Sequence, residues 1–140
     1  MKRTFSSAVL LVFLLVYSQM VLADQSIEES AVAASKAWLS LVDGGRYVES
    51  WNQAAAYFKN ALSKEQWERS LVAVRKPLGS VLSRRLASKT YTKTLPGAPD
   101  GEYVVIQYQS SFENKKSAVE TVTPTMQTDG HWRVSGYYIK

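Results

Sequence analysis

One acidic side chain, Glu120, interrupts a stretch that otherwise alternates as a half-buried strand does. Between Lys116 and Met126, the even-numbered positions from 118 onward are apolar except for Glu120. A carboxylate among apolar neighbours is costly unless it is paired, and it can otherwise mark a site for acid–base chemistry. The residues whose types and expected positions would let them act with Glu120 are Arg84, Tyr108, Ser110 and Tyr138.

The residue types leave three interpretations of this group open. In the first, Glu120 and Arg84 form a structural ion pair, because a buried charge is unfavourable without a partner. In the second, Glu120 lies in water at the open rim of a sheet, as most charges do. In the third, the polar groups converge in a pocket, where Glu120 is a general acid or base and Arg84 or Tyr138 stabilises developing negative charge. We predict the ion pair, formed directly or through Tyr138 or Ser110.

The strands that would carry these residues begin after Gly79, where the period of the hydrophobic positions changes from helical to alternating. Turn-rich segments at 96–101, 114–116 and 128–130 divide this half of the chain. The pattern therefore predicts four antiparallel strands, at Val81–Leu95, Glu102–Phe112, Ser117–Gln127 and His131–Ile139.

Matching the apolar faces of neighbouring strands gives their expected pairing, because a slip of one residue would turn every side chain to the other face. Loops of three residues then place Ser110 opposite Glu120, and Glu120 opposite Tyr138. The pairing across the long first loop places Arg84 opposite Phe112, on a diagonal to Glu120. Arginine is long enough to cover that gap, so the face is expected to hold the proposed pair.

The N-terminal half of the chain predicts helices that cover one face of this sheet. Apolar residues recur at helical spacing from Ile27 to Leu41. The segment Ser26–Glu29 fits a capping box before this stripe, and Gly44-Gly45 ends the helix.

Two more helical stripes follow. One runs from Tyr47 to Phe58, and the other begins at a second capping box, Ser63–Gln66, and stops at Pro77. The stripes place three tryptophans in the core, Trp38, Trp51 and Trp67. The expected architecture is an α+β domain in which N-terminal helices pack on a curved four-stranded antiparallel sheet.

A basic cluster surrounds the segment Pro77–Gly79. Its members are Arg75, Lys76, Arg84 and Arg85. Such a cluster is either a solvated surface or a site for an anion or a lipid headgroup. For the second interpretation the candidate anion-binding residues are Arg75, Lys76 and Arg85.

The first 23 residues have the layout of a secretory signal peptide. Met1–Arg3 is a positive start, residues 8–16 are an uncharged run, and Val21–Ala23 fits a cleavage site. The alternative is an uncleaved anchor, but a span needs about 20 mostly apolar residues and Tyr17–Gln19 interrupts the run. We expect cleavage at this site, a periplasmic or secreted location, no stable membrane anchor afterwards, and a single domain at residues 24–140.

Composition argues against several classes of function. The chain has no Cys and one His, His131, so it lacks a zinc-type ligand set. Its Asp residues are scattered, which argues against a calcium loop. The net charge falls from +5 to +3 when Lys2 and Arg3 leave, which is too small to argue for nucleic acid. We therefore expect no metal, no cofactor and no nucleic-acid partner.

Several motifs, taken together, resemble a known family, called domain of unknown function 4019. They are PGAPDGEYVVIQYQSSF, AVETVT, HWRVSGYYI, SWNQAAAYFK and RKPLGSVLSRR. The resemblance covers nearly all of residues 24–140. The family is similar to the cystatin-like or nuclear-transport-factor-2-like fold group. That resemblance implies a cone, in which a bent sheet wraps on helices and often holds a pocket, and it implies no activity.

Two functions are consistent with these features. The first is an exported, non-catalytic domain that binds a small ligand or an envelope protein, and a homodimer is left open. The alternative is a cone-pocket enzyme of the isomerase or dehydratase type, with Glu120 as acid or base, which is an analogy of fold. A closed core over Glu120 favours the first function. A solvent-connected cavity lined by Glu120 and Tyr138 favours the second.

Overall fold

The computed structural model describes residues 7–140, and at residues 7–18, 21 and 24 it describes the backbone alone. Within this range the helices are α1 (Ser7–Asp43), α2 (Tyr47–Asn52), α3 (Ala56–Ala61), α4 (Lys64–Arg75) and the 3-10 helix η1 (Lys76–Leu78). The strands that follow are β1 (Val81–Thr92), β2 (Tyr103–Phe112), β3 (Lys115–Met126) and β4 (Trp132–Ile139).

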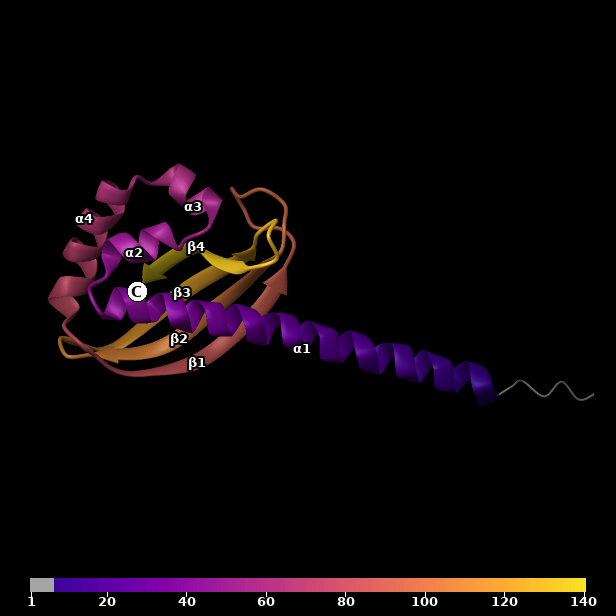
Figure 1. Ribbon diagram of the computed structural model, residues 1–140. Coiled ribbons are helices and arrows are strands. Elements are labelled where there is room, and N and C mark those ends of the chain that lie inside the picture. Colours follow the sequence, from indigo (N-terminus) through magenta and orange to yellow (C-terminus); the bar gives the residue numbers. More distant parts are fainter. Residues whose placement is uncertain (1–6) are drawn as a thin grey trace, which may run out of the picture.

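The strands form one antiparallel sheet in the order β1-β2-β3-β4. Figure 1 shows the helices on one face of this sheet and the N-terminal half of α1 extending away from the body. The prediction of an α+β fold with a four-stranded antiparallel sheet is therefore confirmed. The first strand ends at Thr92 and not at Leu95, since the Thr92 hydroxyl bonds the backbone of Thr94 and turns the chain.

Among the residues described, no helix combines the length and the apolar character that crossing a membrane requires. The positive start predicted at residues 1–3 lies outside the described residues. The side chains of the uncharged run at 8–16 lie outside them as well.

The first helix does not begin where its predicted capping box stands. Helix α1 continues through Ser26, so the box at Ser26–Glu29 is wrong for this chain. The Ser30 hydroxyl donates instead to the Ser26 carbonyl, over 2.9 Å, as a residue inside a helix can. The second box is confirmed, because Ser63 and Gln66 each bond the other's backbone N–H.

The second predicted stripe is divided between two helices. The chain leaves α2 after Asn52 and enters α3 at Ala56. In the break, the Ala55 N–H donates to the Val134 carbonyl of β4 over 2.8 Å. This bond ties the helix layer to the sheet, and it compensates for the interrupted helical hydrogen bonding.

Aromatic side chains join the helices to the sheet. Trp38 and Trp67 are 3% and 5% exposed, and their ring centroids lie 5.9 Å apart. Phe58 meets Trp67 edge-on at 4.8 Å. Trp51 is only half-buried, with its indole N–H donating to the Leu62 carbonyl. The predicted burial is confirmed for the first two tryptophans, whereas Trp51 lies at the margin of the core.

The pairing of β2 with β3 differs from the expected register by two residues. The turn contains only Glu113 and Asn114, and β3 has one extra residue opposite Ser111. Tyr108 therefore lies opposite Glu120, and the expected pairing of Ser110 with Glu120 is wrong. Because the slip is even, each side chain stays on its predicted face.

The pairing of β3 with β4 contains a bulge at Ser135, and here the slip is odd. Thr123 pairs with Gly136, but the next pair is Pro124 with Val134. Beyond the bulge the faces of β4 exchange. The expected pairing of Glu120 with Tyr138 is therefore wrong, and Glu120 lies opposite Ile139.

Strand β1 contains extra residues at Leu82 and Ala87. The second of these lies between the loop and Arg84, and the pairing next to the loop is itself shifted by one residue, so Arg84 lies opposite Ser110 and not opposite Phe112. The correction moves Arg84 along its strand but keeps it on the face that the helices cover. It therefore stays within reach of Glu120.

Candidate functional site

Glu120 lies at the centre of a buried polar group with donors from three other strands. Arg84 contacts both carboxylate oxygens, with Nε 2.7 Å from Oε1 and NH2 3.1 Å from Oε2. The Ser110 hydroxyl donates to Oε1 over 2.5 Å, and the Tyr137 hydroxyl donates to Oε2 over 2.5 Å. The Glu120 side chain is 0% exposed, and that of Arg84 is 15% exposed. The predicted ion pair is confirmed.

A second carboxylate reaches this group from the helix layer. Asp43, the last residue of α1, accepts from Arg84 through NH1 to Oδ2 at 2.7 Å and NH2 to Oδ1 at 3.0 Å. Its Oδ1 also accepts from NH2 of Arg75, at the end of α4, over 2.9 Å. Arg84 therefore bridges Asp43 and Glu120, and it joins the helices to the sheet.

Arg75 completes the group, which we call the ion network: Asp43, Arg75, Arg84 and Glu120. The Arg75 side chain is 4% exposed, and its guanidinium carbon lies 4.8 Å from the centre of the Phe112 ring. Its NH1 is 3.5 Å from the Tyr137 hydroxyl. Two cations face two carboxylates, so the network is formally neutral, as buried charges require.

The electrostatic environment favours this arrangement of charges. Burial alone would raise the pKa of Asp43, but hydrogen bonds and charges, first from Arg84 and then from Arg75, hold it below its ordinary value of 3.8. Burial also opposes the charge of Arg84, yet Asp43 and Glu120 raise its pKa. Burial and then the Glu120 charge raise the pKa of Tyr137, so its hydroxyl remains a neutral donor.

The chemistry open to Glu120 follows from these contacts. Each of its oxygens already accepts two hydrogen bonds, and the Glu120 side chain is 0% exposed. A general base needs a free lone pair within reach of a substrate proton. The arrangement suits a structural network that holds α1 and α4 on the sheet.

The other predicted pocket residues are not among the donors to Glu120. Tyr108 lies opposite Glu120 in the sheet and is 1% exposed, but its hydroxyl is 2.6 Å from that of Ser35 in α1. Burial raises the pKa of Tyr108. Tyr138 is 51% exposed, on the face of the sheet that the helices leave open. Tyr137 takes the place that the sequence pattern had given to Tyr138.

The candidate anion-binding residues are also separated. Arg75 is buried in the ion network, whereas Lys76 and Arg85 are exposed. The burial of Arg75 could have been predicted from helical spacing. Arg75 follows Trp67 and Leu71 at intervals of four residues, and both of these are buried.

The sequence pattern did not predict that Asp43 belongs to the site. An Asp before Gly44-Gly45 is instead typical of a turn that ends a helix. Yet Ser35, Leu39 and Asp43 also follow one another at intervals of four, and the first two are 0% exposed. Tyr137 had no such signal, since the bulge at Ser135 is not visible in the alternation of β4.

Two surface hollows near the site are lined by residues other than Glu120. One of about 450 Å³ opens between α1, the end of α2 and the start of β4. Its lining includes Trp38, Asn52, Gln53, His131, Trp132 and Arg133. A smaller one, of about 330 Å³, lies beside the ion network, next to Asp43, Arg75 and Lys76.

No curated protein matches this sequence. A family model matches residues 34–137, a stretch that runs from the last turns of α1 almost to the end of β4. The match includes the four residues of the ion network and the residues that line the 450 Å³ hollow. The chain therefore belongs to the family described as "Protein of unknown function (DUF4019)".

Proposed function

We propose that this protein is an exported, non-catalytic domain that binds a small ligand or a protein partner of the cell envelope. The observation that carries the proposal is the hollow of about 450 Å³ between the helices and β4. Small-molecule sites in proteins have volumes of roughly 300–1,000 Å³, with apolar walls and a few polar groups.

The walls of this hollow have that mixed character. The indole of Trp132 and the side chains of Ala34 and Ala37 supply apolar surface. Asn52 and Gln53 supply exposed amides. Arg133 lies at the rim, where it pairs with Asp129 over 2.8 Å. A ligand with one flat apolar part and one polar group fits these features.

The hydrogen bonds that Glu120 already accepts support a non-catalytic role. Its carboxylate holds four hydrogen bonds from Arg84, Ser110 and Tyr137, and it lies away from the hollow. The hollow itself contains His131 as a titratable group, with its side chain 74% exposed and 3.5 Å from Asp129. No buried acid–base pair accompanies it in the described residues that line this hollow.

Export rests on the leader-like pattern of residues 1–23 and is supported by the packing of α1. Met20 and Leu22 are 67% and 64% exposed, so this part of the helix has no place in the core. Among the residues of α1 whose side chains are described, the first buried one is Ala31. Cleavage after Ala23 would thus leave every core contact of the described chain in place, and the periplasm is the compartment we propose.

We further assign the domain to the cystatin-like or nuclear-transport-factor-2-like group. Helices on one face only and bulges in β1, β3 and β4 support this assignment, because bulges bend and twist a sheet. In such a cone the ligand would enter from the side of β4, where the hollow opens.

Export is tested by intact-mass measurement on protein from fractionated cells. We expect a chain that begins at Asp24 in the soluble envelope fraction. A full-length mass recovered with the membrane would contradict cleavage.

Ligand binding is tested by native mass spectrometry of the protein purified from its own compartment. We expect an added mass that is lost in Trp132→Ala combined with Gln53→Ala. Tyr138→Ala, which removes an exposed aromatic outside the hollow, should keep it. An added mass that survives the double substitution would exclude this hollow, and a bare polypeptide in every preparation would contradict a tightly held ligand.

A further inference from the structure

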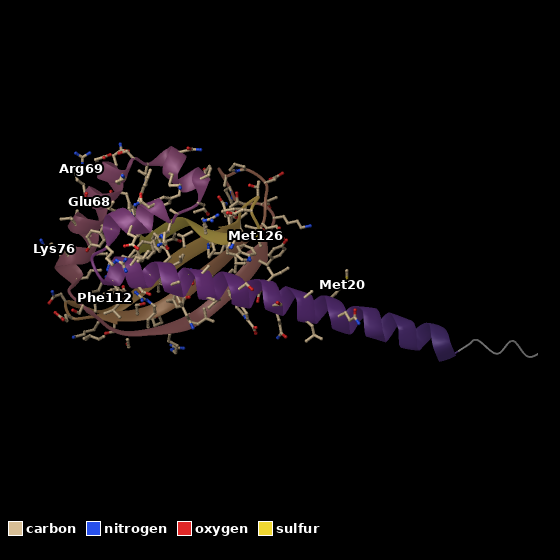
Figure 2. The ribbon with its side chains drawn as sticks, viewed as in Figure 1. Met20, Glu68, Arg69, Lys76, Phe112 and Met126 are labelled. Carbon is tan, nitrogen blue, oxygen red and sulfur yellow. The ribbon has the colours of Figure 1, made fainter. Side chains whose placement is uncertain are left out.

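Exposed basic residues gather at one end of the domain. The turn between β2 and β3 packs against η1, because the Asn114 N–H donates to the Leu78 carbonyl and its side-chain amide donates to the Pro77 carbonyl, both over 2.9 Å. These bonds bring Lys76 of η1 to the same end of the domain as Lys115 and Lys116, the first two residues of β3. In Figure 2, Lys76 and Phe112 lie at this end, and Met126 lies toward the other.

Two more cations lie on the neighbouring open face of the sheet. Arg85 pairs with Gln109, Gln109 with Val119, and Val119 with Lys140, so these four residues form one row across all the strands. Arg85 and Lys140 stand at the two ends of this row. We call the five exposed cations the basic end: Lys76, Arg85, Lys115, Lys116 and Lys140.

The charge of the basic end is not balanced within the described chain. None of its five residues has an ion-pair partner there, whereas the nearby Arg75 and Arg84 are neutralised by Asp43 and Glu120. The exposed acids in these segments are Glu113 and the terminal carboxylate. The basic end therefore presents a local excess of positive charge to solvent.

Apolar and aromatic side chains accompany these cations. Leu82 is 56% exposed in β1, and Tyr138 is 51% exposed at the end of β4. The Lys140 ammonium lies 5.8 Å from the centre of the Tyr138 ring. Cations with an exposed aromatic and an aliphatic residue are typical of surfaces that rest on a lipid headgroup layer, since Tyr favours that depth and Lys attracts anionic lipids.

We propose that the basic end docks on the surface of an anionic phospholipid membrane. This goes beyond the ligand hollow, which lies at the start of β4, whereas Lys140 and Tyr138 lie at its end. A strand of this length separates them by on the order of 25 Å. The hollow therefore stays open to solvent while the basic end is in contact with lipid.

The proposal is tested with vesicles of phosphatidylglycerol and of phosphatidylcholine. The wild type and every variant are expressed from the full sequence and purified in the form that the cell accumulates. All of them should then have the same N-terminus. We expect sedimentation with phosphatidylglycerol vesicles, weak binding to phosphatidylcholine, and loss of binding as salt is raised.

Two charge-matched variants locate the surface. Lys115→Ser, Lys116→Ser and Lys140→Ser together should weaken binding to phosphatidylglycerol by on the order of a hundredfold, since each cation near such a surface contributes roughly fivefold. The control removes three exposed cations elsewhere, as Lys36→Ser, Arg69→Ser and Lys93→Ser. It has the same net charge and should bind like the wild type, and circular dichroism should show both variants folded.

Four results would overturn the proposal. Equal binding of the wild type to both vesicles would show that lipid charge plays no part. Equal losses in the test and control variants would show an effect of net charge and not of the basic end. If polyglutamate displaced the protein from the vesicles as strongly as added phosphatidylglycerol vesicles do, the partner would be an acidic protein. If free inorganic phosphate at the same concentration did so, the partner would be a small anion.

Discussion

The Tyr137 hydroxyl donates to Oε2 of Glu120 over 2.5 Å, from a strand position that faces the helices. The bond completes the set of donors around a carboxylate that is 0% exposed. Hydrogen bonds to charged groups contribute about 1.5–3 kcal/mol to stability, roughly twice the value for neutral pairs. The neighbouring Tyr138 makes no such bond, so the two tyrosines form a matched pair for experiment.

Tyr137→Phe should lower the free energy of unfolding by about 1.5–3 kcal/mol, because it leaves one buried carboxylate oxygen with a single donor. Tyr138→Phe should change it by less than about 0.5 kcal/mol, as surface substitutions usually do. Urea unfolding of the two variants and the wild type measures both values. Equal effects in the two variants would contradict the exchange of faces at Ser135.

Arg84 and Glu120 should be strongly coupled in a double-mutant cycle. Arg84→Met should cost about 3–5 kcal/mol, because it leaves Glu120 without a cation and Asp43 with Arg75 alone. Glu120→Leu should cost less, since Arg84 keeps Asp43 as a partner. The double variant should lose less than the sum, by about 0.5–3 kcal/mol. Urea unfolding of the four proteins supplies the cycle.

The exposed pair of Arg46 and Glu49 is the control for this cycle. Their side chains are 59% and 38% exposed. Pairs in water contribute about 0–1 kcal/mol, so Arg46→Met with Glu49→Leu should show little coupling. Additive losses at Arg84 and Glu120, like those at this surface pair, would mean that the buried bonds contribute nothing measurable.

Asp43 should make the stability of the domain sensitive to acid. Its pKa lies below 3.8 in the folded chain, so its contribution is present above that value and is lost as pH falls through the folded pKa. At neutral pH Asp43→Asn should cost about 1–2 kcal/mol, less than a fully buried pair because its side chain is 25% exposed. Unfolding curves at a series of pH values should show this deficit shrinking below pH 3.8. A deficit that stays constant in acid would contradict the role of the carboxylate charge.

The tryptophans should differ in their contribution to stability. Trp67→Ala should cost about 3–5 kcal/mol, the usual range for a buried large aromatic, and it also removes the bond from the indole N–H to the Ser50 hydroxyl. Trp51→Ala should cost less, because its ring is half-buried beneath Lys59 and Lys64. Thermal unfolding of both variants compares them directly. A larger loss at Trp51 would mean that its contacts with the lysines matter more than core packing.

The pairing of Glu120 with Arg84 could be predicted although the registers around it were wrong. Alternation assigns a side chain to a face, and a slip of two residues leaves that assignment unchanged. The bulge at Ser135 lies in β4, a strand that contains neither residue, so it does not change the face of either one. Alternation alone therefore predicts the face on which each of the two residues lies, but it does not predict which residue lies opposite on the neighbouring strand.

Other members of the site depend on contacts that no local pattern contains. Tyr137 faces Glu120 because of one extra residue in β4, and a bulge leaves no mark on the alternation of the residues that follow it. Asp43 joins the ion network because the end of α1 packs between Arg84 of β1 and Arg75 of α4. That meeting of segments is set by tertiary packing, which overrides the local reading of Asp43 as the start of a turn.

The ion network also bears on how long the domain stays folded. Its bonds join residues that are 32, 36 and 41 positions apart in the chain. We expect contacts at such separation to form late in folding, since the intervening loops must close first. Interactions that are absent from the transition state slow unfolding and leave the folding rate nearly unchanged. Loss of Arg84 should therefore shorten the lifetime of the folded domain much more than it delays refolding.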